Sequence, residues 1–278
     1  MAANRIETAF KNRTQRALLI PFLNVGDPTL ALSLECFRSV IQNGAGIVEI
    51  GVPYSDPLAD GPVIQASALR SLNQGFALPQ VFDLAASLRS EFPSTGLVLF
   101  TYFNPILQYG YEAFFRQAAS SGADGVIVPD LPFEESHPVR EVADAYGVSL
   151  IPLIAPTSGP ARIKQICDYA RGFVYCVSSL GVTGERAKMS DRVEELVNEV
   201  RQCTDLPVCV GFGVSTGRQA NEIANYADGV IVGSAFIRRI TDMVSRSNEL
   251  PSHSDSLTAA ALTAEVAEFA RTLHGAVT

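Results

Sequence analysis

The sequence lacks long apolar runs and an excess of basic residues. No stretch of its 278 residues approaches the length of a membrane span, and segment 1–16 is polar, without the apolar centre of a signal peptide. The formal net charge is −8, whereas nucleic acids and anionic membranes select basic faces. We therefore expect a cytoplasmic protein that binds neither nucleic acid nor membrane.

Cysteine, histidine and lysine are scarce and scattered. The five cysteines include no C-x-x-C pair and no zinc spacing, so buried free thiols are expected. The three histidines, His137, His253 and His274, suggest neither a metal cluster nor a Ser-His-Asp triad. None of the apolar runs contains a lysine, which argues against the Schiff base that many barrel aldolases use. The sequence therefore predicts no metal site and no lysine chemistry.

Eight short apolar runs are present, each followed by a polar turn and a stretch of helical periodicity. The runs begin at residues 17, 46, 96, 125, 148, 172, 206 and 229. They are continuously apolar rather than alternating, which is typical of parallel strands covered on both faces. Eight strand–helix units favour a closed (β/α)8 barrel, the TIM barrel, with extra helices. An open doubly wound sheet is the alternative, although the first turn lacks G-x-G-x-x-G.

The helical stretches have recognisable ends. One begins at Pro28 directly after Asp27, a pair typical of a helix N-cap and first helical position. Segment 246–256 is a polar break, and the apolar periodicity after it predicts one more helix. We expect a single domain over residues 1–278, with a C-terminal helix at about 257–274 that packs on the barrel.

The second run contains a carboxylate, Glu49. Side chains alternate along a strand, so Ile47 and Glu49 share one face while Val48 and Ile50 share the other. If the second face packs under the helices, Glu49 points into the barrel mouth, where the active sites of such barrels lie. Desolvation there raises the pKa of a carboxyl group, which suits a general acid–base. A salt-bridged core glutamate is the alternative, but no basic residue lies near it in sequence.

Two more carboxylates, Asp56 and Asp60, lie on the turn after this run. Each also has a structural interpretation, because Asp56 precedes a proline in a turn and Asp60 stands where a helix could start. The position of Asp60 directly after Glu49 favours a shared ligand. Two carboxylates in different environments can divide acid–base work between them.

Glycine-rich turns follow the last three runs, at 181–184, 211–213 and 233–234. Loops at these places in barrels often bind phosphate through backbone N–H groups and a helix N-terminus. Glycine lets the backbone approach the anion, and the Ser234 hydroxyl adds a donor. Tight turns need glycine in any case, so each pair taken alone also has a structural explanation.

Several motifs in one chain resemble the tryptophan synthase alpha chain family. "VEIGVPYSDPLADGPVIQ" resembles the signature of the family, and "PFLNVGDP", "YFNPILQYG", "GVIVPDLPFEES", "SSLGVTGER" and "VGFGVS" resemble its other blocks in the same order. The resemblance covers nearly the whole chain. It implies a (β/α)8 barrel lyase of L-tryptophan biosynthesis that cleaves indole-3-glycerol phosphate to indole and D-glyceraldehyde 3-phosphate, without metal or Schiff base.

The resemblance also implies a role for each candidate residue. Glu49 matches the general acid–base, and Asp60 matches the carboxylate that binds the indole N–H. The expected indole pocket is Phe22, Phe100, Tyr102, Ile127, Tyr175 and Phe212. The expected phosphate site is Gly184, Gly213, Gly233 and Ser234. Thr183 matches a mobile loop that closes over the substrate, and Asp56 a loop that faces a partner.

The partner that the resemblance implies is a beta chain that holds pyridoxal phosphate (PLP) and takes up indole through a tunnel, in an αββα hetero-tetramer. The chain itself would then need no cofactor. Two alternatives stay open: a free-standing indole-releasing lyase, and a barrel that binds the ligand only to regulate a partner. Intact Glu49 and Asp60 argue against the second.

Overall fold

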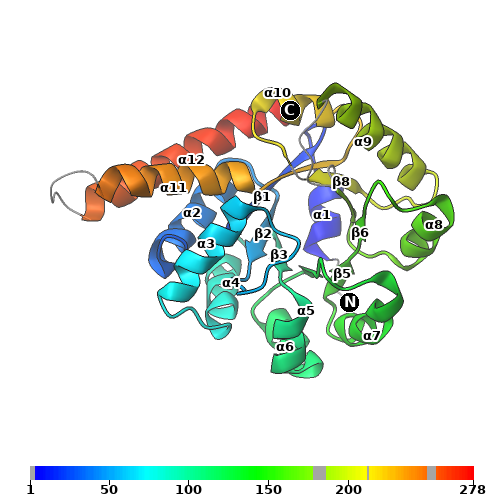
Figure 1. Cartoon of the computed structure of the whole chain (residues 1–278), viewed down its shortest axis with the longest axis horizontal. Helices are drawn as coiled ribbons and strands as arrows, with labels where there is room; N and C mark the ends of the chain where they lie inside the picture. Colours follow the sequence, from blue (N-terminus) through cyan, green and yellow to red (C-terminus); the bar gives the residue numbers. More distant parts are fainter. Residues whose placement is uncertain (1–3, 178–185, 212, 249–254) are drawn as a thin grey trace.

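The computed structural model describes residues 4–177, 186–211, 213–248 and 255–278. All eight apolar runs form parallel strands, and the helices lie around them (Figure 1), which confirms the predicted TIM barrel. The sheet order is β5-β4-β3-β2-β1-β9-β8-β7-β6. The strands are β1 (Leu18–Asn24), β2 (Ile47–Gly51), β3 (Gly96–Phe100), β4 (Gly125–Ile127), β5 (Ser149–Ile151), β6 (Leu153–Ile154), β7 (Val174–Val177), β8 (Val208–Gly211) and β9 (Gly229–Val232).

The fifth run accounts for two of these strands, because Pro152 divides it. β5 pairs with β4 on one side, and β6 pairs with β7 on the other. Proline has no N–H to donate to a neighbouring strand, which interrupts the ladder. Its carbonyl oxygen still accepts the N–H of Tyr175 at 3.0 Å. The nine described strands therefore correspond to the eight predicted runs, with β5 and β6 both belonging to the fifth.

Helices surround the strands and begin where the sequence favours it. Three of them, α3, α4 and α8, have a proline as their first residue. The helices are α1 (Arg5–Lys11), α2 (Leu30–Gln42), α3 (Pro62–Asn73), α4 (Pro79–Glu91), α5 (Phe103–Tyr109), α6 (Tyr111–Ser120), α7 (Ser136–Ala145), α8 (Pro160–Tyr169), α9 (Arg186–Arg201), α10 (Gly217–Ile223), α11 (Ser234–Asn248) and α12 (Asp255–Val277), with a short 3-10 turn at Phe133–Glu135. Across the described residues, every helix is too short or too polar to cross a membrane.

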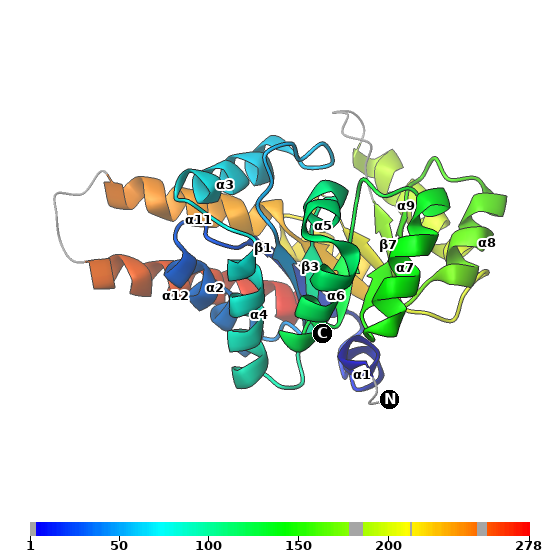
Figure 2. The same cartoon turned by 90° about the horizontal axis from the view of Figure 1, so that it is seen from below.

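The predicted C-terminal helix is α12, which packs on α2, α10 and α11 at one side of the barrel (Figures 1 and 2). The predicted start of α2 was wrong. Its N-cap is Thr29, whose hydroxyl accepts the N–H of Leu32 at 3.2 Å. Asp27 is buried and accepts hydrogen bonds from Arg70 and Ser67 instead, so it is not available to cap α2.

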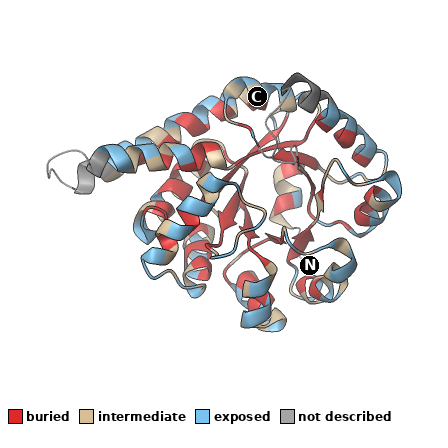
Figure 3. Ribbon diagram, viewed as in Figure 1, coloured by how far each residue is buried: buried red, intermediate tan, exposed pale blue. Residues whose placement is uncertain are grey.

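Buried residues lie along the strands and on the helices (Figure 3). They form one apolar region inside the barrel and two between the strands and the helices. Ile47 belongs to the inner region, whereas Val48 and Ile50 pack with residues of the surrounding helices. The predicted assignment of the two faces of β2 is therefore confirmed. The five cysteines are free thiols, and all but the half-buried Cys203 are buried, as expected.

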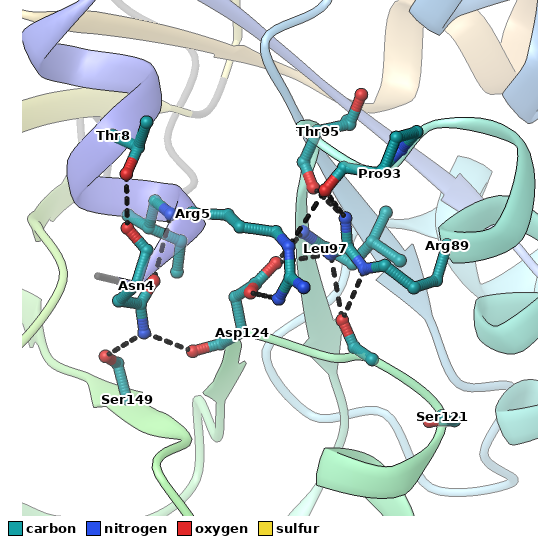
Figure 4. A network of polar contacts seen from close by, with 12 residues as sticks. Asn4, Arg5, Thr8, Arg89, Pro93, Thr95, Leu97, Ser121, Asp124 and Ser149 are labelled. Atoms are coloured by element: carbon teal, nitrogen blue, oxygen red, sulfur yellow. Dashed lines mark hydrogen bonds and ion pairs between the residues drawn. The ribbon is translucent and has the colours of Figure 1, made fainter. Parts of the chain in front are cut away.

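Helix α1 closes the barrel at the end where the strands begin. Ile6 and Phe10 enter the inner apolar region. The Asn4 side chain donates to the carbonyl oxygen of Asp124 at 3.0 Å, and the Arg5 guanidinium donates to the carboxylate of Asp124 at 3.0 Å (Figure 4). Arg89 donates to the other carboxylate oxygen of Asp124 at 2.6 Å. The opposite end, where the strands finish, carries the candidate site.

Candidate active site

Glu49 lies on β2 and faces the interior of the barrel, on the same face as Ile47. Its strand neighbours are Phe22 on β1 and Val98 on β3. It is 1 % exposed, and its Oε1 has no hydrogen-bond partner among the described residues. Burial raises the pKa of this carboxyl well above its ordinary value. Among the described residues Glu49 forms no ion pair, so the alternative of a salt-bridged core glutamate is not supported.

Asp60 lies on the loop between β2 and α3. Burial raises its pKa to about 6, and the hydrogen bond from the Tyr102 hydroxyl opposes that rise. The same hydroxyl accepts the N–H of Ala59 at 3.1 Å, and the Tyr102 ring stacks on Tyr54 with centroids 5.3 Å apart. Asp60 does not cap α3, since the N-cap is Gly61 and no side chain caps that end. Its carboxylate is therefore available for another partner.

Tyr175 on β7 lies near both carboxylates. Burial raises the pKa of its phenol, and the charges of Glu49 and Asp60 raise it further. Tyr175 thus interacts electrostatically with both carboxyl groups. The structure therefore brings the two sequence-predicted carboxylates to one region of the barrel.

The predicted indole-pocket residues that the structure describes are all buried. Phe22 and Phe100 meet edge to face with their centroids 5.3 Å apart. The buried members are Phe22, Phe100, Tyr102, Ile127 and Tyr175. Phe212 lies outside the described residues. Apart from Tyr102, the described members belong to the inner apolar region, so they form aromatic and aliphatic walls around Glu49.

Two strand glycines make room for these walls, and we did not identify that role from the sequence. A Cβ at Gly211 would lie 2.1 Å from the Tyr175 hydroxyl. A Cβ at Gly51 would lie 2.4 Å from Asn24 Oδ1 and 2.6 Å from the Phe22 ring. The available signal was a glycine at the end of an apolar strand, which often marks a close approach of another group.

Gly233 and Ser234 lie beside the aromatic walls. Gly233 follows β9, and a Cβ there would lie 3.2 Å from the Phe22 ring. Ser234 is the first residue of α11, where backbone N–H groups lack intrahelical partners and attract anions. Gly213 follows β8 with φ +81°, a left-handed conformation that favours glycine. Thr183 and Gly184 lie outside the described residues.

A pocket of about 1040 Å³ opens beside Asp60, which is the one predicted site residue among its described lining residues. It extends from Asp60 across the ends of β4 and β6 to α7 and α8, and its walls include Pro129, Leu153 and Val177. Glu49 does not line this opening, in keeping with its burial. In the part of the chain that the structure describes, no group of three or more His, Cys, Asp or Glu side chains is arranged to hold a metal ion.

Comparison with known proteins identifies the family. A family model described as tryptophan synthase alpha chain matches residues 9–268. The chain is 52% identical over 228 residues to the tryptophan synthase alpha chain of Synechococcus elongatus, covering 82% of this chain and 85% of the relative. It is 45% identical over 258 residues to that of Geobacillus thermodenitrificans, covering 93% and 94%.

Solved structures agree with the sequence comparisons. The tryptophan synthase alpha subunit of Legionella pneumophila superposes with a TM-score of 0.87 at 32% identity, covering 99% of both chains. A chain of tryptophan synthase from M. tuberculosis gives a TM-score of 0.84 at 31% identity, covering 99% of this chain and all of that one. The chain belongs to the tryptophan synthase alpha chain family and is a lyase that cleaves indole-3-glycerol phosphate.

Proposed function

We propose that Glu49 carries the proton in this cleavage and that Asp60 holds the indole N–H. Glu49 adds a proton to the indole carbon that bears the side chain, and the adjacent hydroxyl then loses its proton. The carbon–carbon bond breaks, and its electron pair returns to the indole ring. The carbon of the hydroxyl becomes the aldehyde of glyceraldehyde 3-phosphate, and indole is released.

The observation that carries the proposal is the buried Glu49 carboxyl with its unsatisfied Oε1. An unpaired buried polar atom costs about 1–3 kcal/mol, a cost that a substrate group can offset on binding. Burial raises the pKa of this carboxyl, which favours its protonated form, the form that general acid catalysis requires. The proton that the substrate hydroxyl loses as it becomes the aldehyde can then pass to the same carboxylate, which restores the acid.

The environment of Asp60 supports a different task. With a pKa of about 6, its carboxyl is ionised at neutral pH and can accept the hydrogen bond of the indole N–H. The Tyr102 hydroxyl, held by the N–H of Ala59, orients this carboxylate. A negative charge at that nitrogen stabilises the ring while it carries the added proton.

The opposite end of the substrate is anionic. We assign the phosphate to Gly184, Gly213, Gly233 and Ser234, and loop closure to Thr183. The N-terminus of α11 at Ser234 supports the phosphate assignment, because helix N-termini favour anions. The indole ring would lie against Phe22, Phe100, Tyr102, Ile127, Tyr175 and Phe212.

We also propose a beta chain as partner, with PLP in that chain and an αββα assembly. One of the similar solved structures is tryptophan synthase from M. tuberculosis in an aminoacrylate-bound form. Asp56 is exposed on the loop after β2, two residues before Leu58, whose side chain is 90% exposed. We further propose that the protein is cytoplasmic and that residues 1–278 form a single domain.

Glu49→Gln tests the central role. The amide cannot release a proton, so we expect cleavage to fall by at least about a thousandfold while the substrate still binds. The assay is indole release, with binding followed by calorimetry, and Glu91→Gln on the outer surface is the control. Retained turnover in Glu49→Gln would exclude Glu49 as the proton carrier. Repeating the assay with a beta chain separates a free-standing lyase from one that needs its partner.

A further inference from the structure

A buried polar cluster joins the turn after β1 to helix α3. Asp27 is 2 % exposed and accepts two hydrogen bonds from the Arg70 guanidinium, each 2.8 Å long. The Ser67 hydroxyl donates to the same carboxylate at 2.5 Å. The Asn24 amide donates to the Ser67 hydroxyl at 2.9 Å and to the carbonyl oxygen of Ile64 at 3.3 Å.

Arg70 extends this cluster to a second helix. Its Nη2 donates to the Thr241 hydroxyl of α11 at 2.9 Å, in addition to its bond with Asp27. Helices α3 and α11 pack against each other and lie side by side in both views (Figures 1 and 2). A planar guanidinium paired with a carboxylate in two-point geometry holds its direction firmly. Arg70 is therefore a rigid link between the turn after β1, α3 and α11.

The two linked helices lead to opposite ends of the proposed substrate. Asp60, assigned to the indole N–H, lies two residues before α3 begins at Pro62. Ser234, assigned to the phosphate, is the first residue of α11. We propose that Asp27 and Arg70 are positioning residues that fix the distance between the indole end and the phosphate end of the site. The inference rests on the proposed function and adds a device that sets substrate length.

The physical basis is the advantage of a linked ligand. A molecule with an indole end and a phosphate end binds far more tightly than either part, provided that both subsites lie at the spacing of the molecule. When the helices can shift relative to each other, this advantage is lost. Separate indole and separate phosphate do not depend on the spacing, so their affinities stay the same.

Three variants test this. Thr241→Val removes the α11 partner of Arg70 with little change in shape, and Asp27→Asn weakens the two-point pair. Glu91→Gln is the matched control, because Glu91 forms a similar two-point pair with Arg38 between α4 and α2. The dissociation constants of indole-3-glycerol phosphate, indole and inorganic phosphate are measured by calorimetry, with Glu49→Gln present in every protein to prevent turnover.

We expect Asp27→Asn to weaken the intact substrate about tenfold and Thr241→Val about threefold, with indole and phosphate changed less than about twofold. The control should leave all three constants unchanged. Equal weakening of all three ligands, or no loss for the intact substrate in either variant, would overturn the inference. Because Thr241→Val leaves the buried ion pair intact, it provides the test even if Asp27→Asn folds poorly. If the Glu49→Gln proteins still cleaved the substrate, the role of Glu49 would be contradicted. The link would then be tested by comparing the KM for indole-3-glycerol phosphate with the dissociation constants of indole and of phosphate.

Discussion

Replacing Gly211 by alanine should strain the wall of the site. An alanine Cβ would lie 2.1 Å from the Tyr175 hydroxyl and 2.6 Å from its ring carbon Cζ. Both residues are on paired strands, β7 and β8, and Tyr175 is 3 % exposed, so neither can move freely. Overpacking of a core typically costs 1–3 kcal/mol, and we expect about 2 kcal/mol of lost unfolding free energy.

The overlap also identifies a compensating change. Tyr175→Phe removes the oxygen that lies closest to the new Cβ but leaves the ring. In the double variant we therefore expect about 1 kcal/mol of the loss to be recovered, a coupling typical of residues in contact. Gly159→Ala is the matched control, because a Cβ there meets open space, and its effect should stay within about 0.5 kcal/mol.

Urea unfolding gives the stabilities, and indole release gives the activities. We expect Gly211→Ala to lower the activity as well, because a displaced Tyr175 intrudes on the carboxylates. Wild-type stability in Gly211→Ala would refute the steric argument. If Gly211→Ala and the double variant Gly211→Ala/Tyr175→Phe were equally stable, the Tyr175 hydroxyl would not be the obstacle.

Two further predictions concern the carboxylates. Because the pKa of Asp60 is about 6, kcat/KM should fall as the pH drops below about 6. Asp60→Asn should abolish this acidic decrease in the pH–rate profile. If the variant showed the same decrease, another group would be responsible for it. Glu49 has a raised pKa in the folded protein, so the penalty for burying its charge is absent below its ordinary pKa and destabilises the fold as the pH rises above it. The gain in unfolding free energy in Glu49→Gln, followed by urea unfolding, should therefore be larger at pH 8 than at pH 4, and a pH-independent difference would contradict the raised pKa.

The strands and the direction of Glu49 were predictable because both follow from local periodicity. An apolar run of a few residues identifies a buried strand, and alternation along β2 assigns Glu49 to the face of Ile47. The division of the fifth run at Pro152 could also have been read from the sequence, since proline cannot donate to a ladder.

What could not be predicted depends on partners distant in the chain. Asp27 before a proline has the pattern of an N-cap, yet its carboxylate binds Arg70, 43 residues further on. The pairing of Asp60 with Tyr102 and the contact of Gly211 with Tyr175 likewise arise only when strands meet around the barrel. The roles of Glu49 and Asp60 stay predictions for the experiments above.

The closure of the barrel by α1 has a consequence for the synthesis of the chain. Asn4 bonds to Asp124 and Ser149, and Phe10 packs on Phe173 with ring centroids 6.0 Å apart. Chains emerge from the ribosome with the N-terminus first, and segments fold as their partners appear. Helix α1 is made before β4, β5 and β7, so these contacts cannot form until the three strands have been synthesised. Until then Ile6 and Phe10 lack the inner apolar region that buries them in the folded protein.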